Sequence, residues 1–172
     1  MKKIIISLMV FLMTPLIAQA DGHETSGPGE GSFTTFMVQA PDVSAYIKYL
    51  KNNPELFSGF DATAAGVCVT ITGQDYHGEM FVWSAYADVT GAMAETTAYD
   101  PDQAPKELAD LRTPKYRLAW KPLKSFVLSP GFERVTRVKI KPENVPAYIA
   151  AATKLEAAIR NAGHDFNMGI FQ

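Results

Sequence analysis

The hydrophobic pattern first predicts a strand followed by an amphipathic helix. Residues 33–38 are rich in aromatic and β-branched side chains, which favour a strand. Asp42 then stands at a helix N-cap position, and the apolar residues that follow have the i, i+3, i+4, i+7 spacing of one buried helix face: Val43, Tyr46, Ile47 and Leu50. The sequence Asn-Asn-Pro at 52–54 predicts the end of this helix.

The middle of the chain predicts a β-hairpin and then shorter elements. Residues 67–72 and 80–87 have strand character, and the seven residues between 72 and 80 form a long hairpin turn. The segment 88–112 is expected to be irregular except for a short helix at 105–111. Strands are expected at 116–120 and 125–128, and Pro122 between them favours a sheet edge or a bend.

The C-terminal part repeats the pattern of the first. We expect a strand at 135–140, a helix cap at Asn144, a helix at 145–162 that stops at Gly163, and a strand at 166–171. The predicted buried stripe of this helix is Val145, Tyr148, Ile149, Ala152, Leu155 and Ile159. The tract DVSAYI at 42–47 returns 102 positions later as NVPAYI, and GVCV at 66–69 matches GIFQ at 169–172 after a shift of one residue. We interpret these matches as an internal duplication.

The β-α-β-β-(α)-β order and the repeated tract resemble the ferredoxin-like units of the dimeric α+β barrel superfamily, which includes the antibiotic-biosynthesis monooxygenase-like proteins. The expected fold is therefore α+β, with helices packed on one face of an antiparallel sheet. Residues 33–130 form the first ferredoxin-like unit, and residues 131–172 form a partial second unit. The resemblance implies two sheets, from two chains or from a fused duplication, around a cavity that can hold a small organic molecule or haem.

The second unit lacks a hairpin partner, a second helix and a last strand. Either the sequence is a fragment, or a second chain supplies the missing strands, as in a homo-oligomer. Haem-degrading members of the superfamily use a helix histidine, and the corresponding region before Arg112 contains none. This difference argues against haem chemistry.

The first twenty residues have the pattern of a signal peptide. Two lysines precede an apolar run at 4–17, and Ala18-Gln19-Ala20 is a cleavage site of the A-x-A type. The run is shorter than the roughly 20 residues that span a bilayer, and no later stretch replaces it, so no stable membrane anchor is expected. We predict a periplasmic or secreted bacterial protein whose residues 21–32 form a flexible leader.

Composition limits the chemistry that the mature chain can perform. Cys68 is the only cysteine, so the chain cannot form an internal disulfide, and its apolar surroundings favour a buried thiol over a reactive one. Residues 21–114 carry 4 basic and 14 acidic side chains, whereas residues 115–172 carry 10 basic and 4 acidic ones. The basic residues between 115 and 141 provide either a surface for an anionic ligand or a solvent face that meets the acidic half. An exported, net acidic chain argues against nucleic acid as a partner.

Candidate ligand-binding residues lie on the second hairpin strand and in the hairpin turn. Trp83 and Phe81 share one face of that strand, and Tyr86 shares the other face with Met80, although aromatic residues on strands usually belong to the core. His77 could bind a ligand or transfer a proton, and the flanking acids Asp75 and Glu79 could orient its imidazole. An exposed turn histidine without a role is the alternative interpretation.

The mature amino terminus offers the one metal site that the sequence suggests. Cleavage after Ala20 would leave Asp21-Gly22-His23 with a free amine, and the amine, two backbone amides and imidazole can bind Cu(II) or Ni(II) in a square plane. A solvated leader without metal is the alternative, and we expect no other cofactor.

The chain contains no phosphate-binding glycine loop, no paired Cys-x-x-Cys motif and no nucleophile elbow. We therefore expect an exported small-molecule-binding module. The alternatives are a cofactor-independent monooxygenase-like enzyme, inferred from the resemblance, and a structural or interaction protein that assembles through its sheet edges.

Overall fold

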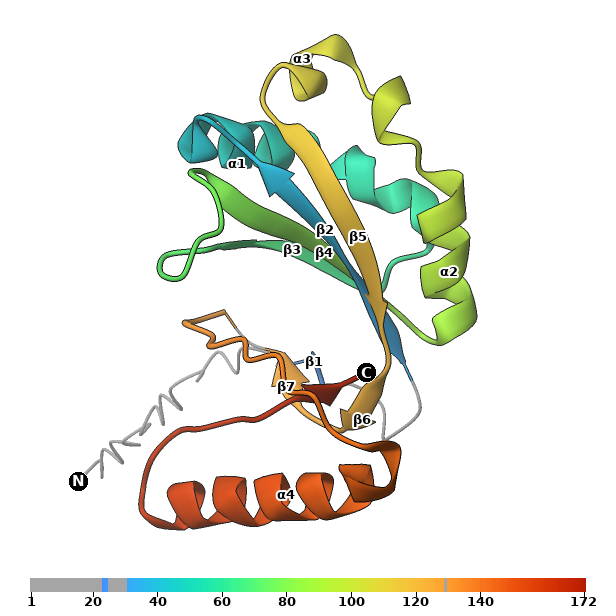
Figure 1. Cartoon of the computed structure of the whole chain (residues 1–172). Helices are drawn as coiled ribbons and strands as arrows, with labels where there is room; N and C mark the ends of the chain where they lie inside the picture. The colour runs from blue at the N-terminus through green and yellow to red at the C-terminus, as the bar shows by residue number, and fades with distance from the viewer. Residues whose placement is uncertain (1–22, 25–30, 129) are drawn as a thin grey trace, which may run out of the picture.

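The structure, a computed structural model, describes residues 23–24, 31–128 and 130–172 (Figure 1). Its main body is a four-stranded sheet in the order β3-β4-β2-β5, in which every neighbouring pair is antiparallel. These strands are β2 (Ser32–Gln39), β3 (Ala64–Val69), β4 (Glu79–Tyr86) and β5 (Thr113–Trp120).

Two helices, α1 (Val43–Asn52) and α2 (Val89–Ala98), cover one face of the sheet, and α3 (Lys106–Ala109) precedes β5 (Figure 1). The order β2-α1-β3-β4-α2-β5, with this arrangement of strands, is that of a ferredoxin-like unit. The predicted α+β fold class is therefore confirmed.

Helix α1 forms as the sequence predicts. The Asp42 carboxylate accepts a hydrogen bond from the backbone N–H of Ala45 at 2.9 Å and caps the helix. Its stripe buries Tyr46 and Leu50 in a core that also contains Val38 of β2 and Met80 of β4. The helix ends at Asn52, and Pro54 begins a 3₁₀ turn (Pro54–Phe60).

The expectation of an irregular segment after residue 88 is wrong, because residues 89–98 form α2. The Asp88 carboxylate caps this helix by accepting a hydrogen bond from the backbone N–H of Gly91 at 2.8 Å. Most of its side chains are small, so the sequence shows no apolar stripe. The helix packs closely on the sheet, and a Cβ atom at Gly91 would lie 3.4 Å from the Cβ of Tyr86. Tertiary packing therefore decides what local propensity does not.

The hairpin is confirmed with shifted bounds, since β3 begins before the predicted residue 67 and ends at Val69. The connection closes on Gly78, whose φ of +73° lies in the left-handed region. A Cβ atom at this position would lie 2.0 Å from the carbonyl oxygen of Ala40. The backbone N–H of Ala40 donates to the carbonyl of Gly78 at 2.9 Å, so the turn is held against the start of α1.

The second half is built around α4 (Val145–Asn161), which lies below the main sheet (Figure 1). Three short strands lie between them: β6 (Pro122–Lys124), β7 (Val127–Leu128) and β8 (Ile170–Phe171). β6 pairs with β8, and β7 pairs with β1 (His23–Glu24).

Several predictions for this half are wrong or only partly met. Residues 135–140 have strand propensity but no ladder partner, so they form no strand, and the strands expected at 125–128 and 166–171 shrink to two residues each. Asn144 stands at the N-cap of α4, yet its side chain makes no capping hydrogen bond. The predicted stop is correct, since Gly163 adopts a φ of +87° just beyond the helix.

A buried charge pair connects helix α4 to β6. Lys124 and Glu156 form a salt bridge while both residues are buried. Lys124 Nζ also donates to the carbonyl of Met168 at 2.9 Å, and Glu156 accepts from the backbone N–H of Met168 at 3.3 Å. Of the predicted stripe, only Ala152 is buried.

The expected signal peptide lies outside the described residues, and the leader falls within them only at 23–24 and 31–32. Across the described part of the chain, no helix has the length and apolar character needed to cross a membrane.

Candidate functional site

The most distinctive surface of the fold is the sheet face that carries no helix. Side chains alternate along strands, so residues next to the core positions Val38, Met80 and Val82 point to this opposite face. The ladder sets aromatic residues side by side there. We call this surface the aromatic face, and its members are Phe33, Met37, Cys68, Phe81, Trp83, Tyr116, Leu118 and Trp120.

Three contacts hold the tryptophan rings of the aromatic face in place. The Trp120 indole N–H donates to the Thr35 hydroxyl at 2.9 Å, and its ring stacks on Phe33 with centroids 6.0 Å apart. The Trp83 indole lies across Gly66, where a Cβ atom would come within 2.7 Å of the ring. A glycine at 66 therefore allows the indole to lie flat over β3. Both tryptophans are half-buried and held in place.

The second half of the chain borders the aromatic face at two places. The Phe171 ring meets Phe33 edge-on at 4.9 Å and Phe126 edge-on at 4.8 Å. Arg137 Nη2 donates to the Tyr116 hydroxyl at 3.0 Å. This bond, together with the negative charges of Asp75 and Glu79, raises the pKa of Arg137. The role of the remaining basic residues at 115–141 stays open.

Cys68 lies on the aromatic face as a free thiol. Burial raises its pKa to about 11, the charge of Glu133 adds to the rise, and a hydrogen bond with Trp83 offsets part of it. The thiolate is therefore scarce at neutral pH, which agrees with the interpretation of Cys68 as an unreactive thiol, although its side chain is half-buried and not fully buried as expected.

The helix-covered side contains a group of charged residues that sequence reasoning did not single out. Arg112 is buried, and its guanidinium donates to the hydroxyl of Tyr46 at 2.8 Å and to the hydroxyl of Tyr99. The guanidinium carbon also lies 4.8 Å from the centre of the Phe36 ring. Burial raises the pKa of Tyr46, with Arg112 opposing it, so this hydroxyl stays protonated and accepts the bond.

A second arginine, Arg117, joins β5 to the end of α2. It donates to the carbonyls of Thr96 and Tyr99 at 3.1 and 2.6 Å, where the last carbonyls of a helix need donors. Arg117 belongs to the basic stretch at 115–141, for which the sequence left open an anionic-ligand surface or a solvent face, but it is half-buried under α2. Lys124, which belongs to the same basic stretch, is buried against Glu156 and does not lie on a solvent face. A charged residue in the middle of an apolar strand run is the sequence signal that could have identified Arg117.

A half-buried carboxyl lies beside Arg117. Burial raises the pKa of Glu95, although the charge of Arg117 opposes the rise, and Glu95 in turn adds to the raised pKa of Tyr86. The Glu95 Oε2 and Tyr86 hydroxyl atoms are both buried, and interactions with the Thr34 hydroxyl offset part of the rise in both pKa values. These two groups lie in the helix-sheet interface, away from the aromatic face.

The structure places the candidate ligand-binding residues of β4 on the two faces that the sequence predicts. Trp83 and Phe81 lie on the aromatic face, whereas Tyr86 is buried on the helix side with Met80. His77 is exposed in the hairpin connection, and its carbonyl accepts from the Gln39 side chain at 3.0 Å.

Of the two acids beside His77, Glu79 bonds to the connection through its carboxylate. Glu79 Oε2 accepts from the backbone N–H of Asp75 at 2.7 Å, and Glu79 Oε1 accepts from the Thr70 hydroxyl at 3.2 Å. Glu79 therefore holds the shape of the turn. The proposed role of His77 stays a prediction.

Of the proposed metal site, Asp21 and Gly22 lie outside the described residues, and only the backbone of His23 is described, in β1. Copper or nickel binding at the mature amino terminus stays a prediction. Within residues 23–24, 31–128 and 130–172, no three His, Cys, Asp or Glu side chains lie close enough together to hold a metal ion.

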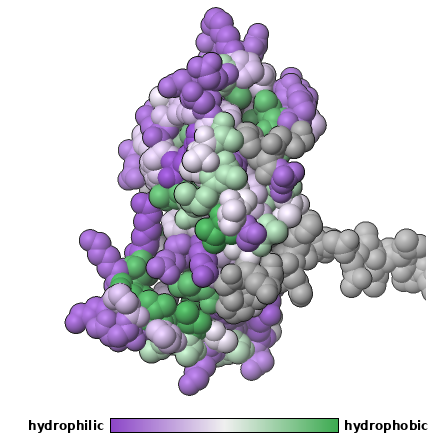
Figure 2. All heavy atoms as spheres, turned by 90° about the vertical axis from the view of Figure 1, so that its right-hand side faces the viewer, coloured by the Kyte–Doolittle hydropathy of each residue, from purple (hydrophilic) through white to green (hydrophobic). Residues whose placement is uncertain are grey.

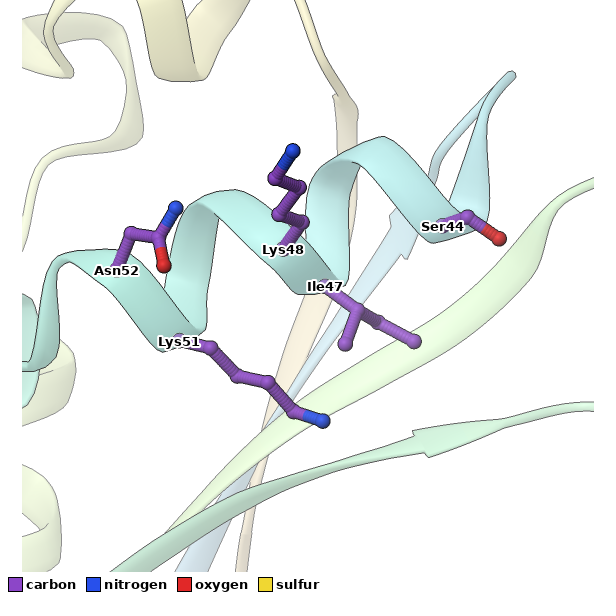
Figure 3. Close-up of a pocket in the computed structure, with 5 residues that line it drawn as sticks. All are labelled: Ser44, Ile47, Lys48, Lys51 and Asn52. Atoms are coloured by element: carbon purple, nitrogen blue, oxygen red, sulfur yellow. The ribbon is translucent and has the colours of Figure 1, made fainter.

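A hollow of about 390 Å³ lies along α1, lined by Ser44, Ile47, Lys48, Lys51 and Asn52 (Figure 3). Ile47 and Lys51 point toward the strands, while Lys48 and Asn52 point away from them. The lining side chains do not converge on a common point, so this hollow is not a candidate site. No protein-family model matches the chain, and the curated proteins give no significant match to it.

Proposed function

We propose that this protein is a binding module that holds a small planar, largely apolar molecule against the aromatic face. The observation that carries the proposal is the row of rings on a rigid sheet, where Phe81, Trp83 and Trp120 stay only half-buried. Rings held by Thr35 and Gly66 lose little conformational freedom when a flat ligand stacks on them. Arg137 at the border of the face would favour a ligand with a negative group.

The resemblance to the dimeric α+β barrel superfamily points the same way, since the sheets of that superfamily enclose a ligand cavity. A monooxygenase-like activity rests on the resemblance alone and is not proposed. Export to the periplasm or the medium stays a proposal that follows from residues 1–20. Self-association is also a proposal, and sedimentation velocity of the mature protein checks it.

The chain offers a direct optical test, because Trp83 and Trp120 are its only tryptophans and both lie on the aromatic face. The probe is 8-anilinonaphthalene-1-sulfonate, which is planar, apolar and anionic. We expect it to quench tryptophan emission and to receive energy from both rings. Trp83→Ala should weaken its binding about tenfold, the equivalent of ~1.4 kcal/mol for one lost stacking partner.

Phe132→Ala is the matched control, because Phe132 is an exposed aromatic residue outside the aromatic face. This variant should bind the probe as the unmodified protein does. Equal affinities for the Trp83→Ala and unmodified proteins would refute the proposal, as would a loss confined to Phe132→Ala.

A further inference from the structure

The two copies of the repeated unit bury equivalent side chains to different extents. Tyr46 of α1 is 0% exposed, whereas its equivalent Tyr148 of α4 is 40% exposed. In the first copy, the core around Tyr46 includes Met80 of β4. That strand lies between β2 and β3 and pairs with both. No described strand takes the place of β4 in the second copy, so Tyr148 lacks the cover that Tyr46 has.

The segment at 134–141 is the second-copy equivalent of β2. At the spacing of 102 positions, Thr34, Phe36 and Val38 correspond to Thr136, Val138 and Ile140. β2 has a neighbour on each side, while no described residue forms a ladder with 134–141. β6 pairs with β8 but not with this segment. A strand position alongside residues 134–141 is therefore unfilled.

Apolar side chains are exposed around this position. Val135 and Val138 are 71% and 52% exposed, and Leu155 of α4 is 52% exposed. Figure 2 shows hydrophobic residues gathered in the lower half of the molecule, at the level of α4 and the short strands above it. Exposed apolar patches of this kind, bordered by charged residues, are typical of interaction surfaces.

The charges of the segment define what can bind there. Over residues 136–141, the cations Arg137, Lys139 and Lys141 alternate along one side and Thr136, Val138 and Ile140 along the other. At the start of the segment this order is reversed, since Val135 lies on the side of the cations and Arg134 on the opposite side. In an added antiparallel strand, residues opposite the cations would be acidic, because opposite charges attract across a ladder. Residues on the other side would be apolar and would cover Tyr148 and Leu155. We propose that residues 134–141 accept an extended strand of alternating acidic and apolar residues from another protein.

A second copy of this chain fits the position less well. The same segment of a second copy would place cations opposite cations, which destabilises a ladder. No described stretch of the chain alternates acidic with apolar residues over six positions or more. The acidic side chains of the first half lie mainly in turns and helices.

The test uses two labelled eight-residue peptides, one alternating valine with glutamate and one alternating valine with lysine. Fluorescence anisotropy with the mature protein should show binding of the glutamate peptide and not of the lysine peptide. Lys139→Glu combined with Lys141→Glu should weaken the binding of the glutamate peptide at least tenfold and should allow the lysine peptide to bind. Both residues are exposed, so the double variant should fold normally.

The matched control is Lys48→Glu combined with Lys51→Glu, which makes the same charge change on exposed residues of α1. It should leave both affinities unchanged. Hydrogen exchange followed by mass spectrometry should show that the glutamate peptide protects residues 134–141.

Failure of the glutamate peptide to bind, or equal losses in the two double variants, overturns the proposal. Protection of residues 134–141 that rises with protein concentration in the absence of peptide assigns the position to a second copy and also overturns it. These outcomes do not depend on the aromatic face, because neither double variant alters it.

Discussion

Truncating Tyr46 and the corresponding Tyr148 should distinguish the fully buried tyrosine of α1 from the partly exposed one of α4. Tyr46 is fully buried, and full truncation of a buried aromatic side chain costs about 3–5 kcal/mol. Its loss also leaves a donor of the buried Arg112 without an acceptor, which adds about 1–3 kcal/mol. We therefore expect Tyr46→Ala to lower the free energy of unfolding by at least ~4 kcal/mol, a large share of the 5–15 kcal/mol typical of a domain.

Tyr148→Ala should cost much less, about 1–2 kcal/mol, because the side chain is 40% exposed and no hydrogen bond of its hydroxyl stabilises the described structure. Tyr46→Phe distinguishes the contribution of the Tyr46 ring to stability from that of its hydroxyl. It keeps the packing and removes only the acceptor of Arg112, for which we expect ~1.5–3 kcal/mol.

Urea unfolding followed by tryptophan emission measures all three variants against the unmodified protein. For a chain of this length, 4 kcal/mol corresponds to a fall in Tm of roughly 8–16 °C. Equal midpoints for Tyr46→Ala and Tyr148→Ala would refute the reasoning, because the two copies would then be packed alike.

Two further predictions concern ionisable side chains. With its pKa raised to about 11, Cys68 should react with Ellman's reagent far more slowly at pH 7.5 than an exposed thiol, and rapid labelling of the folded protein would contradict the packing described for it. Lys124→Met should lower the free energy of unfolding by about 3–5 kcal/mol, because it leaves Glu156 buried and unpaired. Lys124→Met combined with Glu156→Met should be nearly neutral. A double variant as unstable as the single one would contradict this prediction. Burial alone would raise the pKa of Glu156, but the bonds from Lys124 and from the Met168 N–H outweigh burial and lower that pKa. The contribution of Glu156 to stability is therefore present above its unfolded pKa. It is lost as the pH falls through the pKa of the folded state.

The sequence predicted best where local chemistry and tertiary packing agree. In α1, the Asp42 cap, the stripe ending at Leu50 and the stop before Pro54 are all local signals, and the fold uses each of them. In α2, most side chains are small and no stripe is present, so the helix depends on a sheet that the local sequence does not show. The Arg112–Tyr46 contact joins residues 66 positions apart, beyond the reach of any periodicity.

The failed strand at 135–140 has a different cause. Its residues have the right propensity and the right alternation, but a strand is stabilised by its neighbours, and the described residues provide none. The candidate site shows the same limit. Periodicity correctly placed Trp83 with Phe81 on one face and Tyr86 on the other, whereas the neighbours of Trp83, Thr35 on β2 and Gly66 on β3, could be known only from the strand order.

Gly78 limits which sequences can adopt this unit. Any side chain there would collide with the Ala40 backbone, which cannot move without displacing the first turn of α1. Residues 71–75 of the same connection are exposed, so the type of side chain there can change at little cost. Evolution of the hairpin is therefore expected to vary its loop freely while keeping one invariant position where the chain returns to the sheet.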